Sequence, residues 1–296
     1  MSPNTRVGEE AVLARGWWSA HRWLILRRLS QLTILSLFLL GPLAGVWIVK
    51  GNLNYSLTLG VLPLTDPYVA LQSLLAGHLP ETLGLLGVLV VTVFYGLVGG
   101  RVYCSWVCPV NAVTDAAGWL RDRLGIKGSA HIGRQTRYWV LAMTLLVSAG
   151  SGVVLWELIN PVSMLHRGLI FGLGTAWTVV LGVFLFDLFV MSRGWCGHLC
   201  PVGAFYSLLG RWSPLRVNAG RRQDCNDCMD CFAVCPEPQV IRPALKGEAK
   251  GVGPVILAAA CTNCGRCIDV CAKDVFRFGL RHAGRGEALP GGPARD

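Results

Sequence analysis

Two runs of closely spaced cysteines constrain this chain more than any other feature. Residues 225–236 read Cys-Asn-Asp-Cys-Met-Asp-Cys-Phe-Ala-Val-Cys-Pro, and residues 261–271 repeat the spacing C-x2-C-x2-C-x3-C. Bacterial ferredoxins with two 4Fe-4S clusters have this spacing, and the fourth cysteine of each run binds the cluster of the other run. The runs therefore predict a small α+β ferredoxin domain over residues 216–282.

The crossed arrangement assigns the eight cysteines to two sites. The first cluster is assigned to Cys225, Cys228, Cys231 and Cys271, and the second to Cys261, Cys264, Cys267 and Cys235. Zinc is the alternative, although its sites favour two separated C-x2-C pairs. The second run ends in Cys271-Ala272 instead of Cys-Pro, which leaves its local turn open but not its ligand number. Such clusters offer no open coordination position, so the domain is expected to carry electrons.

The rest of the chain is apolar enough to indicate a membrane protein. Hydrophobic residues make up 53% of the chain and charged residues 15%, and the mean hydropathy is +0.49. Four stretches approach the ~20 residues with which a helix crosses a bilayer. They are Leu29–Val49, Leu83–Tyr103, Tyr138–Trp156 and Leu169–Met191. We therefore predict a membrane all-α domain of four transmembrane helices over residues 29–215, with a kink at Gly41-Pro42.

Basic residues gather on alternate sides of these stretches. Before the first stretch lie Arg6, Arg15, Arg22, Arg27 and Arg28. Between the second and third stretches lie Arg101, Arg121, Arg123, Lys127, Arg134 and Arg137. The other two loops hold only Lys50 and Arg167. By the positive-inside rule, residues 1–28 form a cytoplasmic tail and the ferredoxin domain is cytoplasmic too, followed by a disordered tail over 283–296.

Other interpretations of the basic residues are weaker. The net charge of +10 is explained by topology, because no basic run interleaved with aromatic residues indicates a nucleic-acid partner. Arg27-Arg28 also matches a twin-arginine export signal, but the apolar run after it is long and lacks a cleavage site. A reducing cytoplasm, in addition, keeps thiolates available for metal.

The membrane domain contains an internal repeat with an offset of 92 residues. Arg101, Tyr103, Cys104, Cys108, Pro109, Val110 and Ala112 align with Arg193, Trp195, Cys196, Cys200, Pro201, Val202 and Ala204. Each half is predicted to be a helical hairpin that ends in a C-x3-C-P motif. Two hairpins of the same orientation form parallel repeats about an axis near the membrane normal, an arrangement that brings both motifs together.

The four cysteines of these motifs, Cys104, Cys108, Cys196 and Cys200, leave several roles open. Small buried cysteines often serve packing alone, but a repeat with matched arginine, aromatic and proline residues favours a function. The candidates are a shared four-thiolate site for a further metal or cluster, a redox dithiol pair, and a docking surface for a partner. The sequence does not choose among them.

With these motifs, the chain resembles the NapH family of ferredoxin-type quinol dehydrogenase components and the wider NapH and MauN group. The resemblance is carried by both ferredoxin runs, the paired C-x3-C-P motifs and residues 63–67, 71–73, 77–80, 156–163 and 195–204. It implies a multi-pass protein of the bacterial inner membrane that passes electrons from quinol toward a periplasmic nitrate reductase. The partners it implies are an iron-sulfur protein resembling NapG and a c-type cytochrome. The direction of electron flow through cytoplasmic clusters stays open.

A quinone site needs a nearby base, because quinol oxidation releases protons. Asp187 is one candidate, since an acid within a membrane span marks a functional site; neutralisation by Arg101 or Arg193 is the alternative. His78, in the loop after the first stretch, is the other candidate. Additional loop groups are Asp66, Glu81, Glu157 and His166, for which a solvated surface position is the simpler interpretation.

Three classes of function follow from these features. The first is a membrane electron carrier of the quinol dehydrogenase type. The second is a redox-maintenance or maturation factor for a partner metalloenzyme, and the third is a scaffold subunit. The sequence has no glycine-rich nucleotide loop, flavin fingerprint or C-x-x-C-H haem site, so the chain is not expected to complete a substrate reaction alone.

Overall fold

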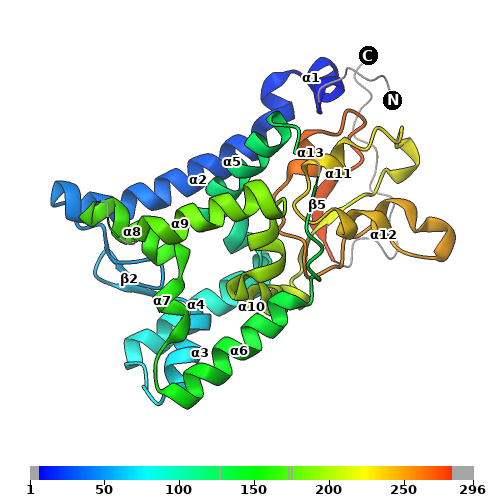
Figure 1. Cartoon of the computed structure of the whole chain (residues 1–296). Coiled ribbons are helices and arrows are strands. Elements are labelled where there is room, and N and C mark those ends of the chain that lie inside the picture. The colour runs from blue at the N-terminus through cyan, green and yellow to red at the C-terminus, as the bar shows by residue number, and fades with distance from the viewer. Residues whose placement is uncertain (1–6, 127, 173, 175, 282–296) are drawn as a thin grey trace.

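The computed structural model describes residues 7–126, 128–172, 174 and 176–281. Long helices fan out on one side of the molecule, and the cysteine-rich C-terminal lobe packs at their common end (Figure 1). The predicted disordered tail 283–296 lies outside the described residues, as do Arg6 and Lys127 of the basic flanks.

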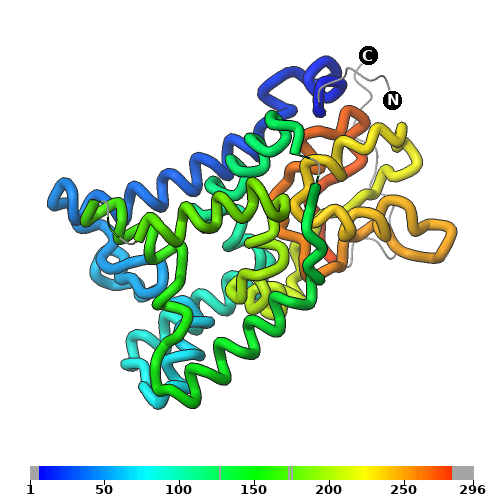
Figure 2. The backbone as a smooth tube through the Cα atoms, viewed as in Figure 1, coloured from blue at the N-terminus to red at the C-terminus, as the bar shows by residue number. Residues whose placement is uncertain are grey.

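The first half of the helical part contains a small sheet as well as helices. Its elements are α1 (Glu9–Arg15), α2 (Trp17–Ala44), β1 (Val49–Gly51), β2 (Tyr55–Thr58), β3 (Leu62–Thr65), α3 (Pro67–Leu75), α4 (Thr82–Val98), the π-helical segment η1 (Tyr103–Val107) and α5 (Val110–Arg123). The three strands form an antiparallel meander, with Val49 opposite Thr58 and Tyr55 opposite Thr65. In Figure 2, α2 runs from the cysteine-rich lobe to this sheet.

The second half repeats the helices without the sheet. Its elements are α6 (Thr136–Ser151), α7 (Leu155–Ile159), α8 (Pro161–Phe171), α9 (Ala176–Leu185), the π-helical segments η2 (Phe186–Val190) and η3 (Trp195–Leu199), α10 (Pro201–Leu209) and the 3₁₀ turn η4 (Gly210–Trp212). The elements follow one another in the same order in both halves: α2, α3, α4, η1 and α5 in the first, and α6, α8, α9, η3 and α10 in the second. Both C-x3-C-P motifs thus begin as π-helical turns, which are frequent at functional sites.

The predicted spans are not four uninterrupted spanning helices. Among the described residues, α2 is the one helix long and apolar enough to cross a membrane. Gly99 ends α4 and Gly152 ends α6, with φ of +126° and +68°, values that an L side chain rarely adopts. Helix α2 passes through Pro42 and ends at Ala44, and the next residue, Gly45, has a left-handed backbone conformation. The prediction of an all-α membrane domain with four spans is therefore not confirmed.

The cysteine-rich lobe combines short helices with a two-stranded sheet. Its elements are β4 (Leu215–Asn218), η5 (Arg222–Asp224), α11 (Asp230–Val234), η6 (Pro238–Val240), α12 (Ile241–Lys246), η7 (Glu248–Lys250), α13 (Arg266–Asp269) and β5 (Arg277–Leu280). Strands β4 and β5 pair antiparallel, with Leu215 opposite Leu280. Val217, Ile241 and Phe276 lie in its buried core. The lobe therefore has a hydrophobic core of its own.

Within the predicted N-terminal tail, the described residues form α1 and the first turns of α2, and both contact the lobe. Arg15 pairs with Asp274 at 2.6 Å. The buried Asp269 carboxylate accepts hydrogen bonds from the backbone N–H groups of Trp23 and Leu24. Gly265 has a φ of +73°, and a Cβ there would lie 2.5 Å from the Trp23 ring. The lobe is thus held close to the start of α2.

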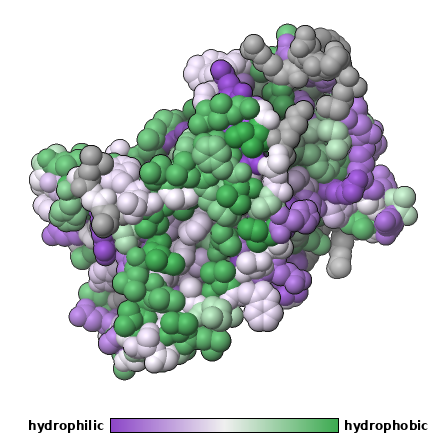
Figure 3. All heavy atoms as spheres, in the orientation of Figure 1, coloured by the Kyte–Doolittle hydropathy of each residue, from purple (hydrophilic) through white to green (hydrophobic). Residues whose placement is uncertain are grey.

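Hydrophobic side chains cover much of the helical part in Figure 3, and hydrophilic ones gather over the cysteine-rich lobe. Leu89 and Phe94 on α4 are 59% and 52% exposed, and Leu146 on α6 is 69% exposed. Large apolar side chains at such exposure favour contact with lipid or another apolar partner.

Candidate iron-sulfur and thiol sites

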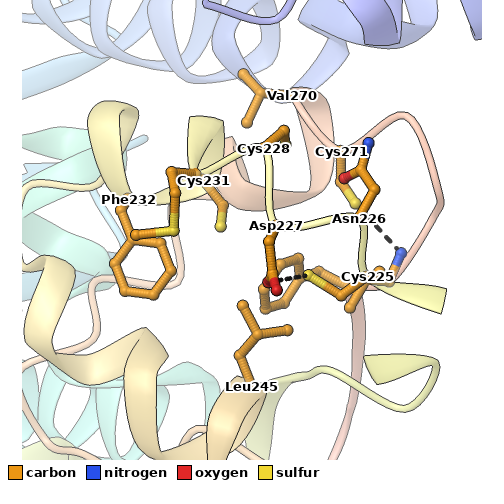
Figure 4. A pocket seen from close by; sticks show the side chains of 12 residues that line it. Cys225, Asn226, Asp227, Cys228, Cys231, Phe232, Leu245, Val270 and Cys271 are labelled. Carbon is orange, nitrogen blue, oxygen red and sulfur yellow. Dashed lines mark hydrogen bonds between the residues drawn. The ribbon is translucent and has the colours of Figure 1, made fainter. Parts of the chain in front are cut away.

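The first pocket of the lobe brings together one cysteine of the second run with three of the first. Cys225, Cys228, Cys231 and Cys271 line a pocket of about 350 Å³, whose other walls are mainly apolar. Figure 4 shows these four side chains around one space, with Phe232, Leu245 and Val270 beside them. This is the grouping that the crossed spacing predicts.

The second pocket has the complementary composition. Cys261, Cys264 and Cys267 of the second run line a pocket of about 360 Å³ together with Cys235 of the first. Within the described residues, no three His, Cys, Asp or Glu side chains are grouped tightly enough to bind a single metal ion. Four thiols nevertheless surround each pocket.

The backbone of the two runs bends in the same way around the pockets. The second and fourth residues after the first cysteine have positive φ in both runs: Asp227 and Met229 at 59° and 66°, Asn263 and Gly265 at 46° and 73°. Left-handed residues within such a loop turn successive N–H groups inward and form an anion-binding concavity, as in many iron-sulfur sites. Val275 N–H also donates to Cys271 Sγ at 3.4 Å. The residues present therefore fit a 4Fe-4S cluster in each pocket.

A third cavity, here called the thiol cavity, lies between the two halves of the helical part. The four cysteines of both C-x3-C-P motifs line it, and its volume is about 480 Å³. Its walls are Asn54, Asp66, Tyr103, Cys104, Cys108, Val110, Trp156, Asn160, Pro161, Val162, Trp195, Cys196, Cys200, Val202 and Gly203. The structure thus brings the two motifs together, as the repeat predicts.

Polar side chains from two short helices line the same cavity. Asp66 caps α3, accepting a hydrogen bond from Tyr68 N–H at 2.9 Å, and Asn160 caps α8, accepting one from Val162 N–H at 3.0 Å. Both caps are followed by proline at the first helical position, which suits a helix start. Burial raises the pKa of Asp66 to about 6, although the hydrogen bonds from Tyr68 N–H and the Tyr206 hydroxyl oppose the shift.

The thiol cavity and the second cysteine pocket are linked by two equivalent arginines of the repeat. Arg101 donates to the carbonyl of Ala260, the residue before Cys261, at 2.8 Å, and to the carbonyl of Cys196 at 3.0 Å. Arg193 donates to the carbonyl of Cys235 at 3.0 Å. Both repeats therefore contact the loops of the second pocket.

The first C-x3-C-P motif contacts that pocket through its own residues as well. The Ser105 hydroxyl donates to the carbonyl of Thr262 at 2.8 Å, and the Trp106 indole N–H donates to the carbonyl of Asn263 at 3.2 Å. The second pocket, and not the first, is thus the one that adjoins the thiol cavity.

Glu237 holds this interface together electrostatically. Glu237 is 1% exposed, and its carboxylate pairs with Arg101 at 2.6 Å, Arg137 at 3.0 Å and Arg134 at 3.2 Å. Burial disfavours the charged carboxylate, but the Arg101 guanidinium and the hydrogen bonds from Gln239 and Arg101 outweigh burial and lower the pKa of Glu237. The ion pairs join the lobe to both halves of the helical part.

Of the two bases predicted for quinone chemistry, His78 lies away from the thiol cavity, whereas Asp187 lies behind its wall residue Trp195. Asp187 accepts a hydrogen bond from Trp195 N–H at 2.9 Å and so supports the start of η3. It forms no ion pair with Arg101 or Arg193 in the described part of the chain. His78 is exposed, with its Nε2 3.3 Å from the carbonyl oxygen of Gly152. Neither side chain lines the cavity.

The four additional loop groups do not all lie at the solvated surface, as was predicted for them. Asp66 is buried in the cavity wall, and His166 is buried against Phe38. Glu81 is exposed, whereas Glu157 is half-buried and accepts from Asn54. Asn160 and Trp156, which also line the thiol cavity, were not predicted as site residues. The Asx-Pro dipeptides Asp66-Pro67 and Asn160-Pro161 are the sequence signal that the two halves share here.

Comparison with known families agrees with the two kinds of site. A family described as "4Fe-4S binding domain" matches twice, at residues 81–127 and 173–219, which are the two halves of the repeat. A family described as "4Fe-4S dicluster domain" matches residues 224–275. Both the helical part and the lobe are therefore similar to families described as 4Fe-4S binding.

Several curated proteins are similar over almost their whole length. "Methylamine utilization ferredoxin-type protein MauN" of Methylorubrum extorquens is 55% identical, covering 92% of this chain and 94% of the relative. "Ferredoxin-type protein NapH" of Escherichia coli is 50% identical over 93% and 95%, and that of Haemophilus influenzae 49% over 95% and 97%. No solved structure matches the chain.

Proposed function

Because the chain belongs to the NapH and MauN family of ferredoxin-type proteins, we propose that it is a membrane electron-transfer subunit that takes electrons from quinol through iron-sulfur centres. The observation that carries the proposal is the thiol cavity. Four cysteines from two repeats converge there, directly beside a pocket of the ferredoxin lobe. Such a stack of redox-competent sites suits the transfer of single electrons.

Each pocket of the lobe is assigned one 4Fe-4S cluster. Cys225, Cys228, Cys231 and Cys271 hold the first, and Cys235, Cys261, Cys264 and Cys267 hold the second. Apolar walls and inward N–H groups support these assignments, since burial and hydrogen bonds to sulfur tune the reduction potential of a cluster. When bound, the clusters supply one-electron chemistry, and the chain positions and insulates them.

The four thiols of the thiol cavity are assigned a third iron-sulfur centre. Four cysteines are the usual ligand set for a 4Fe-4S cluster, and the cavity is larger than either pocket of the lobe. The repeat supports the assignment, because each half contributes two thiols at equivalent positions.

Iron analysis tests the third centre. The anaerobically purified protein is expected to contain about twelve irons per chain, and about eight if only the lobe binds clusters. Replacing Cys104 and Cys196 together with alanine is expected to lower the content by about four and to leave the EPR signals of the lobe. An unchanged iron content in the double variant contradicts the assignment.

The proposal includes a multi-pass topology with the lobe in the cytoplasm of a bacterial inner membrane. Helices α4 and α6 have 17 and 16 residues, or about 25 Å at 1.5 Å per residue. This is a little short of the ~30 Å hydrocarbon core, which thins locally around short helices. Exposed leucines on these helices and the basic residues beside the lobe support this orientation.

The acceptor side of the proposal follows the family resemblance. An iron-sulfur protein resembling NapG and a c-type cytochrome would pass the electrons to a periplasmic nitrate reductase. Relatives named for methylamine utilization are 55% identical, so an acceptor from that system belongs in the same experiment. Reoxidation of the quinol-reduced protein by each candidate acceptor distinguishes the two systems.

Quinol-driven reduction tests the function itself. Adding a reduced, short-chain quinol to the anaerobic protein in detergent or proteoliposomes is expected to produce the EPR signals of reduced clusters. A sample without quinol defines the fully oxidised limit, and reduction by dithionite defines the fully reduced limit. If dithionite reduces the clusters but quinol leaves them oxidised, the electron-carrier function is wrong and a maturation or maintenance role is favoured instead.

A further inference from the structure

The polar end of the thiol cavity includes two corresponding helix starts, one in each half, whose capping residues differ. Asp66-Pro67 begins α3, and Asn160-Pro161 begins α8. Both side chains accept from the backbone N–H two residues later, at 2.9 and 3.0 Å. Asparagine and aspartate cap helices equally well, so capping does not explain why the first repeat has a carboxylate.

The Asp66 carboxylate is buried without a cation. It is 5% exposed, and in the described part of the chain it forms no ion pair. The groups that face it are Tyr206 of α10, whose hydroxyl lies at 3.3 Å, Tyr68 of its own helix, and Glu157 of α7. Tyr95 of α4 and Tyr103 of η1 are also near, as are the cavity thiols.

A donor with no partner lines the same cavity. Trp156 is 2% exposed, and its indole N–H has no hydrogen-bond partner among the described residues. A buried donor of this kind is costly unless a ligand satisfies it. A carboxylate that accepts a proton and an N–H that donates to a carbonyl oxygen are complementary to the two oxidation states of a quinone.

We propose that the polar end of the thiol cavity binds the head group of a quinol and that Asp66 accepts its proton. The proposal rests on the proposed function, since it names the substrate-binding residues of that function. Quinol loses two electrons and two protons to become quinone. The electrons would leave singly to the oxidised iron-sulfur centres that the cysteines hold when loaded, and the protons pass one after the other from a quinol hydroxyl to the Asp66 carboxylate, which releases each to solvent water before it accepts the next.

The Asp66→Asn variant tests the proposal, because it keeps the helix cap and removes the proton acceptor. Quinol-driven reduction, followed by rapid-mixing absorbance and freeze-quench EPR, is expected to slow by about 100-fold, the usual contribution of a general base. In the wild type the rate should rise with pH as the Asp66 carboxyl group loses its proton, and this rise should be lost in the variant. Asp122→Asn, the same change at an exposed site on α5, should match the wild type.

Each result bears on one claim. Equal rates for Asp66→Asn and the wild type overturn the Asp66 inference and leave the electron-carrier function standing. A wild type that quinol does not reduce overturns the function. If Asp66→Asn loses its clusters, as judged by dithionite reduction, the Tyr206→Phe variant is used to test the role of Asp66 instead. Loss of the Tyr206 hydrogen bond, which stabilises the carboxylate, should move the pH profile upward, and an unmoved profile contradicts the inference.

Discussion

Replacing Cys235 with alanine is expected to remove the cluster of the second cysteine run, although Cys235 belongs to the first. Cys235 lines the pocket of Cys261, Cys264 and Cys267. A cube that loses one of four thiolate ligands is lost or degraded, so the iron content should fall by about four per chain. Alanine is used because serine can bind iron in place of cysteine.

Four variants test whether the fourth cysteine of each run binds the cluster of the other run. Cys235→Ala and Cys264→Ala should leave the same remaining cluster, with one midpoint potential in EPR redox titrations. Cys271→Ala and Cys231→Ala should leave the other, with a second potential, because the charged residues that line the two pockets differ: Asp227 in the first, Glu237 and Arg266 in the second. If Cys235→Ala instead matches Cys231→Ala, the ligands are not crossed.

Loss of the Glu237 charge is expected to produce the largest fall in stability of any single change at the interface. In Glu237→Gln, Arg101 and Arg137 stay buried without their counter-charge. Removing one member of a buried ion pair costs about 3–5 kcal/mol. The apparent unfolding temperature in detergent, followed by tryptophan fluorescence, should fall clearly, and limited proteolysis should separate the lobe from the helical part sooner.

Arg134→Gln is the matched control, because Arg134 contacts the same carboxylate from a side chain that is 43% exposed. Exposed ion pairs contribute about 1 kcal/mol or less. The control should therefore change the unfolding temperature little. Equal effects of Glu237→Gln and Arg134→Gln would show that burial of the charges at this interface does not determine its stability.

The grouping of the cysteines was predictable because it depends on local spacing. A run of C-x2-C-x2-C wraps one pocket, and the chain then cannot bring the fourth cysteine back to the same site, so Cys235 and Cys271 exchange places. The repeat was predictable for a similar reason, since Cys104–Pro109 and Cys196–Pro201 preserve the same residue types at one offset.

Only the tertiary structure decided where the helices end and which acid reaches the thiol cavity. Apolar composition does not reveal that Gly99 and Gly152 adopt left-handed or extended positive-φ conformations, so the spans were predicted too long. The choice between Asp187 and Asp66 depends on contacts between residues far apart in sequence, such as Asp66 with Tyr206. The sequence alone thus determined the grouping of the cysteines, which is set by local spacing, whereas the placement of Asp66 in the wall of the thiol cavity depends on long-range packing.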